Sequence, residues 1–429
     1  MTDPDIILSL FSRLRRRFPA LEIDSSGQKR LYLNSGAGSL MVDSSVRAMT
    51  EAGHLNPMPG QIASPEIATA DLHKTVRQLA ADFTGARRPE EISFHFSTTG
   101  ALFNLAFALR KLFQPGKNLL VTDLDHFANI TPWETIGRAG GAEIRTARLT
   151  SELTLDLKDL LSKVDNNTVL VALTGASNAL GTILPLSDII SEIKRKSRAL
   201  VVVDAVHLAP HTPLDVQEFG CDFLAFSGYK IFGPMIGVLY SRSEAQELAS
   251  PYRVETNRPD PPYCWEQGML PNQLLAGLKG AFDYLMDAGS QVKPGDSPTY
   301  PRKLFLRAME SIKKYELELS QYFLERWRRM DSPRLKFYGI SDPRRALSRT
   351  PTFALEILGI EPAEVKKQFW ENHRILIADG NHYSAVVVRH LGKKALNRVS
   401  LAHYDGPDSI DRFFDGLEHI ISKLNKSSS

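Results

Sequence analysis

Residues 199–242 read ALVVVDAVHLAPHTPLDVQEFGCDFLAFSGYKIFGPMIGVLYSR, and this stretch indicates the fold. It opens with the apolar, β-branched run Leu200–Val203, which is typical of a buried parallel strand. Asp204 follows at the carboxyl end of that run, where open α/β sheets place their ligands. Lys230 comes later, in a Ser-Gly-Tyr-Lys turn after a second apolar run. The stretch therefore predicts an acid and a lysine at the ligand-binding edge of a parallel sheet.

An acid and a lysine in these positions match the needs of pyridoxal 5'-phosphate (PLP). A lysine holds the aldehyde of PLP as a Schiff base, and a carboxylate keeps the ring nitrogen protonated so that the ring can withdraw electrons. Lys230 and Asp204 fit these two roles, and His207 is placed to reach the phenolic oxygen of the ring. A single aspartate after a strand would more often be a helix cap or turn residue. The interpretation therefore depends on the pair.

Composition sets wider limits on the function. The chain has 429 residues, 43% of them hydrophobic and 24% charged, as in ordinary soluble globular proteins. A net charge of +3 gives no general attraction to nucleic acid or membranes, and no apolar run is long enough to span a bilayer. Cys221 and Cys264 have no paired spacing, so we expect neither disulfides nor a metal site. The same two cysteines suit a reducing compartment, and acidic residues ahead of the first arginines give the wrong charge order for a secretory signal. We therefore expect a cytoplasmic location.

Strand and helix patterns alternate as in a parallel α/β sheet. The expected strands are Glu91–His95, Asn118–Thr122, Glu143–Thr146, Thr168–Thr174, Ala199–Asp204, Phe223–Phe226 and Gly237–Ser241. The helices expected between them are Ala101–Leu112, Asn129–Ala139, Leu155–Val164 and Ser187–Lys196. Beyond a long helix at Arg302–Arg329, the pattern predicts strands at Thr352–Ile357, Arg374–Ala378 and Arg398–His403 and a final helix at Asp408–Leu424.

A phosphate group requires a helix N-terminus with small donor side chains, because free backbone amides and the helix dipole favour an anion there. The segment Ser97–Gly100 lies between an expected strand and a helix that begins near Ala101, and it offers Thr98 and Thr99. Ser227 would add a third hydroxyl. Helix capping alone would explain either threonine, so the predicted phosphate site depends on the threonines together with Ser227.

Five segments in a fixed order now support a resemblance to a known family. They are LYLNSGAG from Leu31, DHFANITPW from Asp125, SNALGT from Ser177, the block from DAVHLAPH to SGYKIFGP, and RVSLAHYDGP from Arg398. With these segments the chain resembles the class V aminotransferase group of fold-type I PLP enzymes. Within that group it looks most like the branch of cysteine desulfurases and selenocysteine lyases, in a cysteine desulfurase-like subgroup that lacks the catalytic cysteine.

The resemblance implies the domain organisation. Residues 31–290 would form a large PLP-binding domain of α/β class, with a mostly parallel seven-stranded sheet. Residues 291–429 would form a small α+β domain. An N-terminal helical segment, residues 1–30, would belong to this small domain. Enzymes of this fold usually work as homodimers, and a homodimer is expected here.

The resemblance also assigns residues to the site. His126 would stack on the PLP ring and relay protons, although a core or loop histidine is the plainer interpretation. Asn178 would lie near the phenolic oxygen and the substrate carboxylate, or would be only a turn residue. Arg398 would bind the α-carboxylate of an amino acid with its planar guanidinium, unless it forms an ordinary surface salt bridge. His382 and Tyr383 would lie on the substrate side.

Departures from the family pattern are equally informative. Cysteine desulfurases carry a nucleophilic cysteine on a loop that would fall near residues 379–384, and here Tyr383 takes its place. Without a thiolate acceptor, persulfide transfer is not expected. Residues 266–269 read Glu-Gln-Gly-Met where many relatives have a Gly-Thr that reaches the neighbouring subunit's phosphate. Tyr229 stands before the lysine where desulfurases often have histidine.

The leading hypothesis is therefore a PLP-dependent lyase that expels sulfur from the β-carbon of a cysteine-derived amino acid and forms pyruvate and ammonia. Lys230 would act as the base at the α-carbon, and Asp204 would support the charged ring. His126, His382 or Tyr383 would protonate the leaving group, and the sequence does not choose among them. An aminotransferase, an epimerase or a decarboxylating enzyme would use the same residues. A binding protein that retains the fold without turnover is a further alternative.

Overall fold

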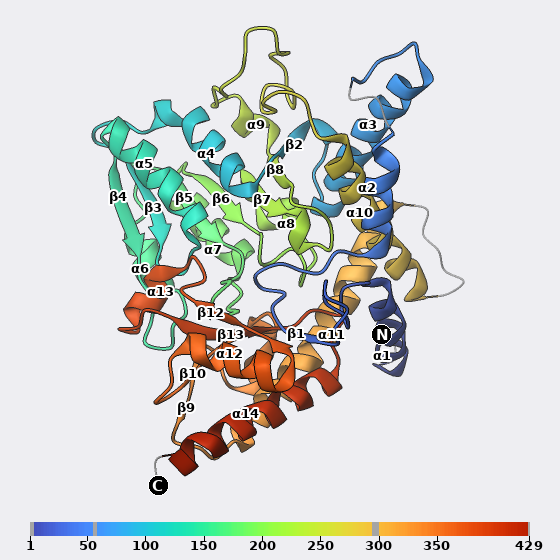
Figure 1. The fold of residues 1–429 in the computed structure, drawn as a ribbon. Coiled ribbons are helices and arrows are strands. Elements are labelled where there is room, and N and C mark those ends of the chain that lie inside the picture. Colours follow the sequence, from blue (N-terminus) through green and yellow to red (C-terminus); the bar gives the residue numbers. More distant parts are fainter. Residues whose placement is uncertain (1–3, 55–57, 294–299, 428–429) are drawn as a thin grey trace.

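The computed structural model describes residues 4–54, 58–293 and 300–427. Its larger sheet has seven strands in the order β2-β8-β7-β6-β5-β3-β4 (Figure 1). The strands are β2 (Ile92–His95), β3 (Asn118–Thr122), β4 (Glu143–Ala147), β5 (Thr168–Thr174), β6 (Leu200–Asp204), β7 (Phe223–Ser227) and β8 (Gly237–Ser241). Within this sheet β8 runs antiparallel to β2 and β7, and the other neighbours are parallel. The predicted mostly parallel seven-stranded sheet is confirmed.

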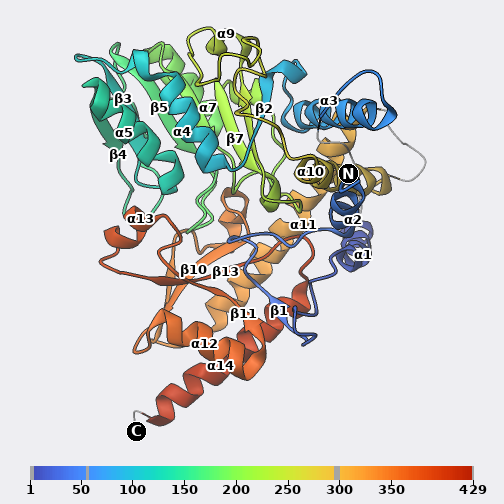
Figure 2. The same ribbon diagram turned by 45° about the horizontal axis from the view of Figure 1, so that its top comes forward.

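Both faces of this sheet are buried, which explains its continuous apolar strands. In β6, Val201 and Val203 belong to one apolar core, whereas Leu200 and Val202 belong to another on the opposite face. Helices α4 (Thr98–Ala108) and α5 (Thr131–Gly140) cover the second face (Figure 2). The first face packs against α3 (Ser64–Thr84), α7 (Leu186–Lys196) and α10 (Asn272–Gln291). Short helices α6 (Leu157–Ser162), α8 (Val216–Phe219) and α9 (Ser243–Gln246) complete the connections.

A second sheet has four antiparallel strands in the order β12-β13-β10-β9. They are β9 (Leu335–Tyr338), β10 (Thr352–Ile357), β12 (Ala378–Gly380) and β13 (Leu396–Ser400), with helices α11 (Pro301–Arg329), α12 (Pro362–His373), α13 (Ala385–His390) and α14 (Pro407–Ser427). Figure 1 shows this sheet below the larger one, in orange and red. A further pair, β1 (Leu31–Tyr32) and β11 (Ile375–Leu376), is parallel.

Two expected strands of this region were wrong in detail. The strand expected at 374–378 is two strands, because β11 pairs with β1 whereas β12 pairs with β13. The strand expected at 398–403 runs from Leu396 to Ser400, so Arg398 lies in its middle. The residues after Ser400 leave the sheet because the backbone turns there, where the amide of Ala402 bonds the Asp405 carboxylate.

Three helices near the N-terminus pack against α10, which covers one face of the larger sheet. Besides α3, they are α1 (Pro4–Leu14) and α2 (Asp43–Ala52), and α10 packs against α1, α2, α3 and α11. The domain limits at residues 30 and 290 stay a prediction. In the described part of the chain, no helix combines the length and apolar character needed to cross a bilayer.

Candidate active site

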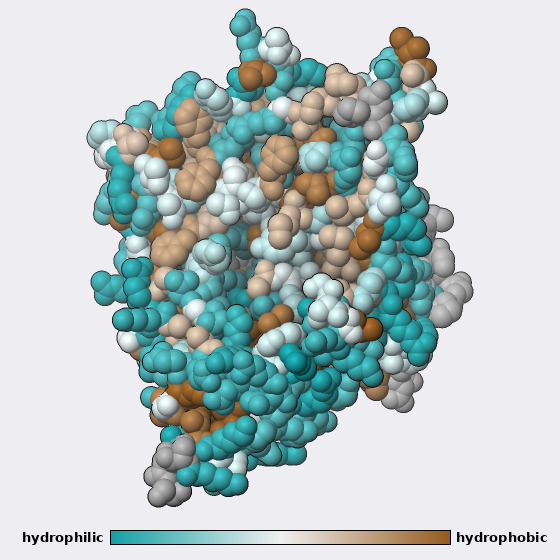
Figure 3. Space-filling view, in the orientation of Figure 1, coloured by the Kyte–Doolittle hydropathy of each residue, from teal (hydrophilic) through white to brown (hydrophobic). Residues whose placement is uncertain are grey.

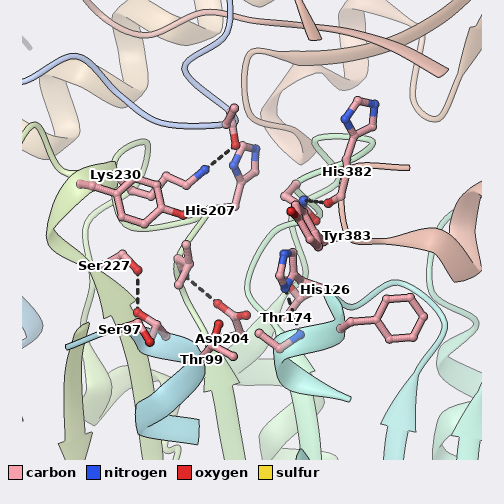
Figure 4. Close-up of a pocket in the computed structure, with 18 of the residues that line it drawn as sticks. Ser97, Thr99, His126, Thr174, Asp204, His207, Ser227, Lys230, His382 and Tyr383 are labelled. Atoms are coloured by element: carbon pink, nitrogen blue, oxygen red, sulfur yellow. Dashed lines mark hydrogen bonds between the residues drawn. The ribbon is translucent and has the colours of Figure 1, made fainter. Parts of the chain in front are cut away.

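A cavity of about 1070 Å³ lies at the carboxyl ends of β5, β6 and β7, where these strands face β12 and β13 of the second sheet. The last residues of the three strands, Thr174, Asp204 and Ser227, all line it. Every site residue expected from the sequence lines this one cavity: Thr98, Thr99, His126, Asn178, Asp204, His207, Ser227, Lys230, His382, Tyr383 and Arg398. Figure 4 shows many of these side chains around a common space.

Lys230 ends a 3₁₀ turn, Gly228–Lys230, that directly follows β7. Its side chain is buried, and Nζ donates a hydrogen bond to the carbonyl oxygen of Gly36. Burial, with the nearby Arg398 guanidinium, lowers the pKa of Lys230 to about 7, although Asp204 acts in the opposite direction. A large fraction of Lys230 is therefore an uncharged amine at neutral pH, the form that attacks carbonyl groups and accepts protons.

Asp204 is the last residue of β6, and its side chain is buried in the floor of the cavity. Its Oδ1 accepts a hydrogen bond from the amide of Val206 at 2.9 Å. Burial raises the pKa of Asp204 to about 6, while the Val206 amide and the Lys230 charge act to lower it. Among the described residues, no cationic side chain forms an ion pair with the Asp204 carboxylate. The carboxylate is therefore available to a cationic ring nitrogen of a ligand.

The hydroxyl groups expected for a phosphate gather at one end of the cavity. The Thr98 hydroxyl lies 2.5 Å from the Ser227 hydroxyl and 2.9 Å from the carbonyl oxygen of Phe226. Helix α4 begins at Thr98, three residues before the expected start, because Ser97 caps it by accepting the amide of Gly100 at 3.0 Å. Thr98 and Thr99 therefore belong to the first helical turn, where free backbone amides and the dipole favour an anion.

Buried hydrogen bonds around Asp125, the residue before His126, fix the turn that places His126 at the cavity. Asp125 accepts hydrogen bonds from the Thr122 hydroxyl and, at 2.6 Å, from the Asn129 side chain, which in turn accepts one from Trp133. The amide of Ala128 donates to His126 Nδ1 at 3.0 Å, so the proton of the neutral ring is on Nε2. Burial, with Lys230 and then Arg398, lowers the pKa of His126 to about 4.

His207 lines the cavity and is buried. Its Nε2 lies 3.0 Å from the Thr352 hydroxyl and 3.2 Å from the Thr350 hydroxyl. Its Nδ1 is buried and has no hydrogen-bond partner among the residues that the structure describes. Burial holds the pKa of His207 well below its usual value, with the nearby His211 as a second cause. The ring is thus neutral.

Asn178 ties the loop that carries His382 and Tyr383 to the larger sheet. Its side-chain amide donates to the carbonyl of His382 at 2.7 Å, and its Oδ1 accepts from the Ser384 hydroxyl at 2.6 Å. The amide of Phe127 donates to the carbonyl of Tyr383 at 2.9 Å. His382 and Tyr383 have φ values of 53° and 56°, a left-handed conformation that costs non-glycine residues energy. These hydrogen bonds hold the loop in that conformation.

Arg398 is buried, and in the described part of the chain no carboxylate pairs with it. Its Nη1 donates to the carbonyl of Asn178 at 2.7 Å, and its Nε has no hydrogen-bond partner in the described ranges. Burial lowers the pKa of Arg398 to about 10, so it remains a cation at neutral pH. A buried guanidinium without a counter-ion is a binding site for a carboxylate.

The polar groups that line the cavity match the polar groups of PLP. Buried nitrogen atoms of three lining side chains, His207 Nδ1, His382 Nε2 and Arg398 Nε, have no hydrogen-bond partner in the described structure. Such orphaned groups are costly and point to a polar ligand. An amine, an opposing carboxylate and a hydroxyl-lined helix N-terminus match the aldehyde, ring nitrogen and phosphate of PLP.

Two contributors had not been predicted. Gly36 supplies the acceptor for Lys230, and an added Cβ there would lie 3.1 Å from Cζ of Arg398 and 2.9 Å from Oγ of Ser400. Asp125 anchors the His126 turn. The only signals for these roles were the position of Gly36 in the LYLNSGAG segment and that of Asp125 directly before His126.

Comparisons with known proteins agree with this geometry. The family described as Aminotransferase class-V matches residues 31–292 and 305–413. A cysteine desulfurase of Pectobacterium atrosepticum is 31% identical over 424 residues, which cover 95% of this chain and 97% of the relative. A cysteine desulfurase of Dickeya dadantii is 32% identical over 425 residues, with coverage of 95% and 96%.

Solved structures share the fold. The apo structure of a cysteine desulfurase from Thermococcus onnurineus NA1 superposes with a TM-score of 0.83 at 24% identity, and covers 99% of each chain. A C-DES mutant with glycine covalently linked to its PLP cofactor gives a TM-score of 0.75 at 18% identity, with coverage of 96% and 98%.

Proposed function

The chain belongs to the aminotransferase class-V family and is a PLP-dependent enzyme, and from that premise we propose that it is a carbon–sulfur lyase. The proposed substrate is an amino acid derived from cysteine. In the proposed reaction the bond between the β-carbon and sulfur breaks, the sulfur leaves as a thiol, and water hydrolyses the remaining three-carbon fragment to pyruvate and ammonia, without an enzyme-bound persulfide.

The observation that carries this proposal is the anchored loop at Tyr383. A desulfurase needs a thiolate that can reach the substrate sulfur, and at the corresponding place this chain has a tyrosine. The loop is held by the Asn178 side chain and the Phe127 amide. Cys221 and Cys264 are buried outside the cavity, and burial raises their thiol pKa values to about 12 and about 11. A persulfide acceptor is therefore missing among the residues that line the cavity.

In this proposal the site residues keep the roles expected from the sequence. Lys230 would hold the PLP aldehyde, Asp204 would pair with the ring nitrogen, and His126 would lie against the ring. Thr98, Thr99 and Ser227 would hold the phosphate group, and Asn178 and His207 would approach the phenolic oxygen. When bound, PLP supplies an electron-withdrawing ring that stabilises negative charge at the α-carbon of the substrate.

The chain's own groups then orient the substrate and move protons. Arg398 binds the α-carboxylate with two parallel N–H donors, which fixes the α-carbon close to Lys230. The amine of Lys230, with its pKa lowered to about 7, takes the α-proton. His382 and Tyr383 form part of the cavity wall on the substrate side.

We also propose that the enzyme is a homodimer of the cytoplasm. Apolar side chains at the cavity rim are exposed, with Phe96 at 67%, Phe103 at 40% and Met235 at 73%. In Figure 3, tan and brown side chains are scattered over the half of the molecule that carries the larger sheet. A second copy that covers this rim would remove apolar surface from water and close the cavity. The two buried free cysteines support a reducing compartment.

Product analysis tests the lyase proposal. The PLP-loaded enzyme is incubated with S-methyl-L-cysteine in D₂O, and the products are identified by mass spectrometry, with Lys230→Ala as the inactive control. Equal amounts of pyruvate, ammonia and methanethiol are expected. Accumulation of the pyridoxamine form would indicate transamination, deuterium at an inverted α-carbon would indicate epimerisation, and carbon dioxide would indicate decarboxylation. In a second incubation with L-cysteine as the substrate, alanine and a protein persulfide would contradict the persulfide-free reaction.

A further inference from the structure

Tyr229 lies immediately before Lys230 in the turn Gly228–Lys230, and its side chain lines the cavity. The centre of its ring is 5.3 Å from Lys230 Nζ. The backbone of the turn is fixed by Ser39, whose amide donates to the carbonyl of Tyr229 at 3.2 Å and whose hydroxyl donates to that of Lys230 at 2.7 Å. The phenol is therefore held next to the amine.

The hydroxyl of Tyr229 has no hydrogen-bond partner among the described residues. Tyr32 is different, because its hydroxyl donates to the carbonyl of Gly38 at 2.6 Å. Burial and the Asp204 carboxylate raise the pKa of Tyr229, whereas Arg398 acts to lower it. Tyr229 is thus a protonated phenol that lines the cavity, and its hydroxyl donates no hydrogen bond to the described residues.

The other candidate proton donors are less suited to a departing sulfur. Burial lowers the pKa of His126 to about 4 and that of His382 to about 3, with Lys230 or Arg398 as the next cause. Both imidazoles are neutral at pH 7, and a neutral imidazole is a far weaker acid than a phenol. Tyr383 is a phenol, but 73% of it is exposed to solvent. Tyr229 is the phenol next to Lys230, the proposed base.

We propose that Tyr229 is the general acid that protonates the departing sulfur, an assignment that rests on the proposed lyase function. Lys230 Nζ takes the proton from the α-carbon. The bond between the β-carbon and sulfur breaks with its electron pair on sulfur, and the Tyr229 hydroxyl gives its proton to that sulfur. The Lys230 ammonium then returns a proton to the Tyr229 oxygen. The net result moves one proton from carbon to sulfur, and both side chains regain their starting forms.

The leaving group decides how much this acid matters. A general acid contributes about 10²–10⁴-fold to the rate when the leaving group needs a proton. An alkyl thiolate is basic, with a pKa of about 8.5 or higher, whereas chloride leaves without protonation. Loss of the Tyr229 hydroxyl should therefore slow thiol release and leave chloride release almost unchanged.

The test compares S-methyl-L-cysteine and 3-chloro-L-alanine with the PLP-loaded wild type, Tyr229→Phe and Tyr32→Phe. Exchange of the α-proton of L-alanine in D₂O, followed by NMR, reports the Lys230 step alone. Tyr229→Phe should lose about 100-fold or more of methanethiol release, while chloride release and α-proton exchange change by less than about 3-fold. Tyr32→Phe should match the wild type in all three assays, because its hydroxyl is committed to a backbone carbonyl.

Equal losses with both leaving groups in Tyr229→Phe would show a structural role and overturn the assignment. Full methanethiol release by Tyr229→Phe, beside an active wild type, would overturn the assignment while the lyase function stands. A wild type that exchanges the α-proton of alanine but expels neither leaving group would overturn the lyase function, and the role of Tyr229 with it.

Discussion

Replacing Lys230 with methionine should stabilise the cofactor-free protein, although it removes the residue that we propose holds PLP. Burial lowers the pKa of Lys230 from its ordinary value of 10.5 to about 7. The unfolded chain therefore binds more protons at this residue than the folded chain between these two pH values. The cost to folding is present in full below pH 7 and disappears as the pH rises past 10.5.

The size of the effect follows from the same two pKa values. One pKa unit corresponds to about 1.36 kcal/mol, so the cost is about 4 kcal/mol at pH 7 and about 2 kcal/mol at pH 9. The substitution also removes the hydrogen bond from Lys230 to Gly36, a loss of about 1 kcal/mol. The expected net gain is about 3 kcal/mol at pH 7 and about 1 kcal/mol at pH 9.

Urea unfolding of the cofactor-free proteins at pH 7 and pH 9 measures this gain. Lys158→Met, at an exposed lysine of α6, gives the effect of the same chemical change on the surface. A Lys230→Met protein that is less stable than the wild type at pH 7, or equally stabilised at both pH values, would refute the reasoning that burial of the amine is the dominant cost.

Three further predictions concern the cavity wall. Ser227→Ala removes the hydroxyl 2.5 Å from that of Thr98 and should raise the Kd for PLP about 10-fold, and an unchanged Kd in equilibrium dialysis would count against the phosphate site. Arg398→Lys keeps the charge but loses the planar fork, so KM for the amino acid should rise about 100-fold with a smaller change in kcat; steady-state kinetics with an unchanged KM would contradict this role. Asn178→Ala removes two anchors of the Tyr383 loop, so the amide of Ser384 should exchange with deuterium about 10-fold faster or more, and unchanged exchange would show that other contacts hold the loop.

The larger sheet could be predicted because each of its buried strands is visible in the sequence as an apolar run. Val201 and Val203 face one core while Leu200 and Val202 face the other, and such doubly buried strands are continuous apolar runs in the sequence. Helix α3 was not predicted, because it mixes charged and apolar residues and buries one stripe that includes Val76.

The site residues at strand ends could be predicted for a similar local reason. Asp204 follows its strand directly, and the edge of a parallel sheet fixes where its side chain lies. The contact between Lys230 and Gly36 joins residues 194 positions apart, and the Asn178 anchors join residues more than 200 positions apart. These contacts depend on how the two sheets meet, which the family resemblance implies but local patterns do not encode.

The most direct test of the central claim is to locate the covalent bond to PLP. The PLP-loaded wild type is reduced with borohydride and digested, and the modified peptide is identified by mass spectrometry. A single modified residue at Lys230, with none in Lys230→Ala, is the expected result. Modification at another lysine, or a wild type that gains no modification after loading with PLP, would contradict the account.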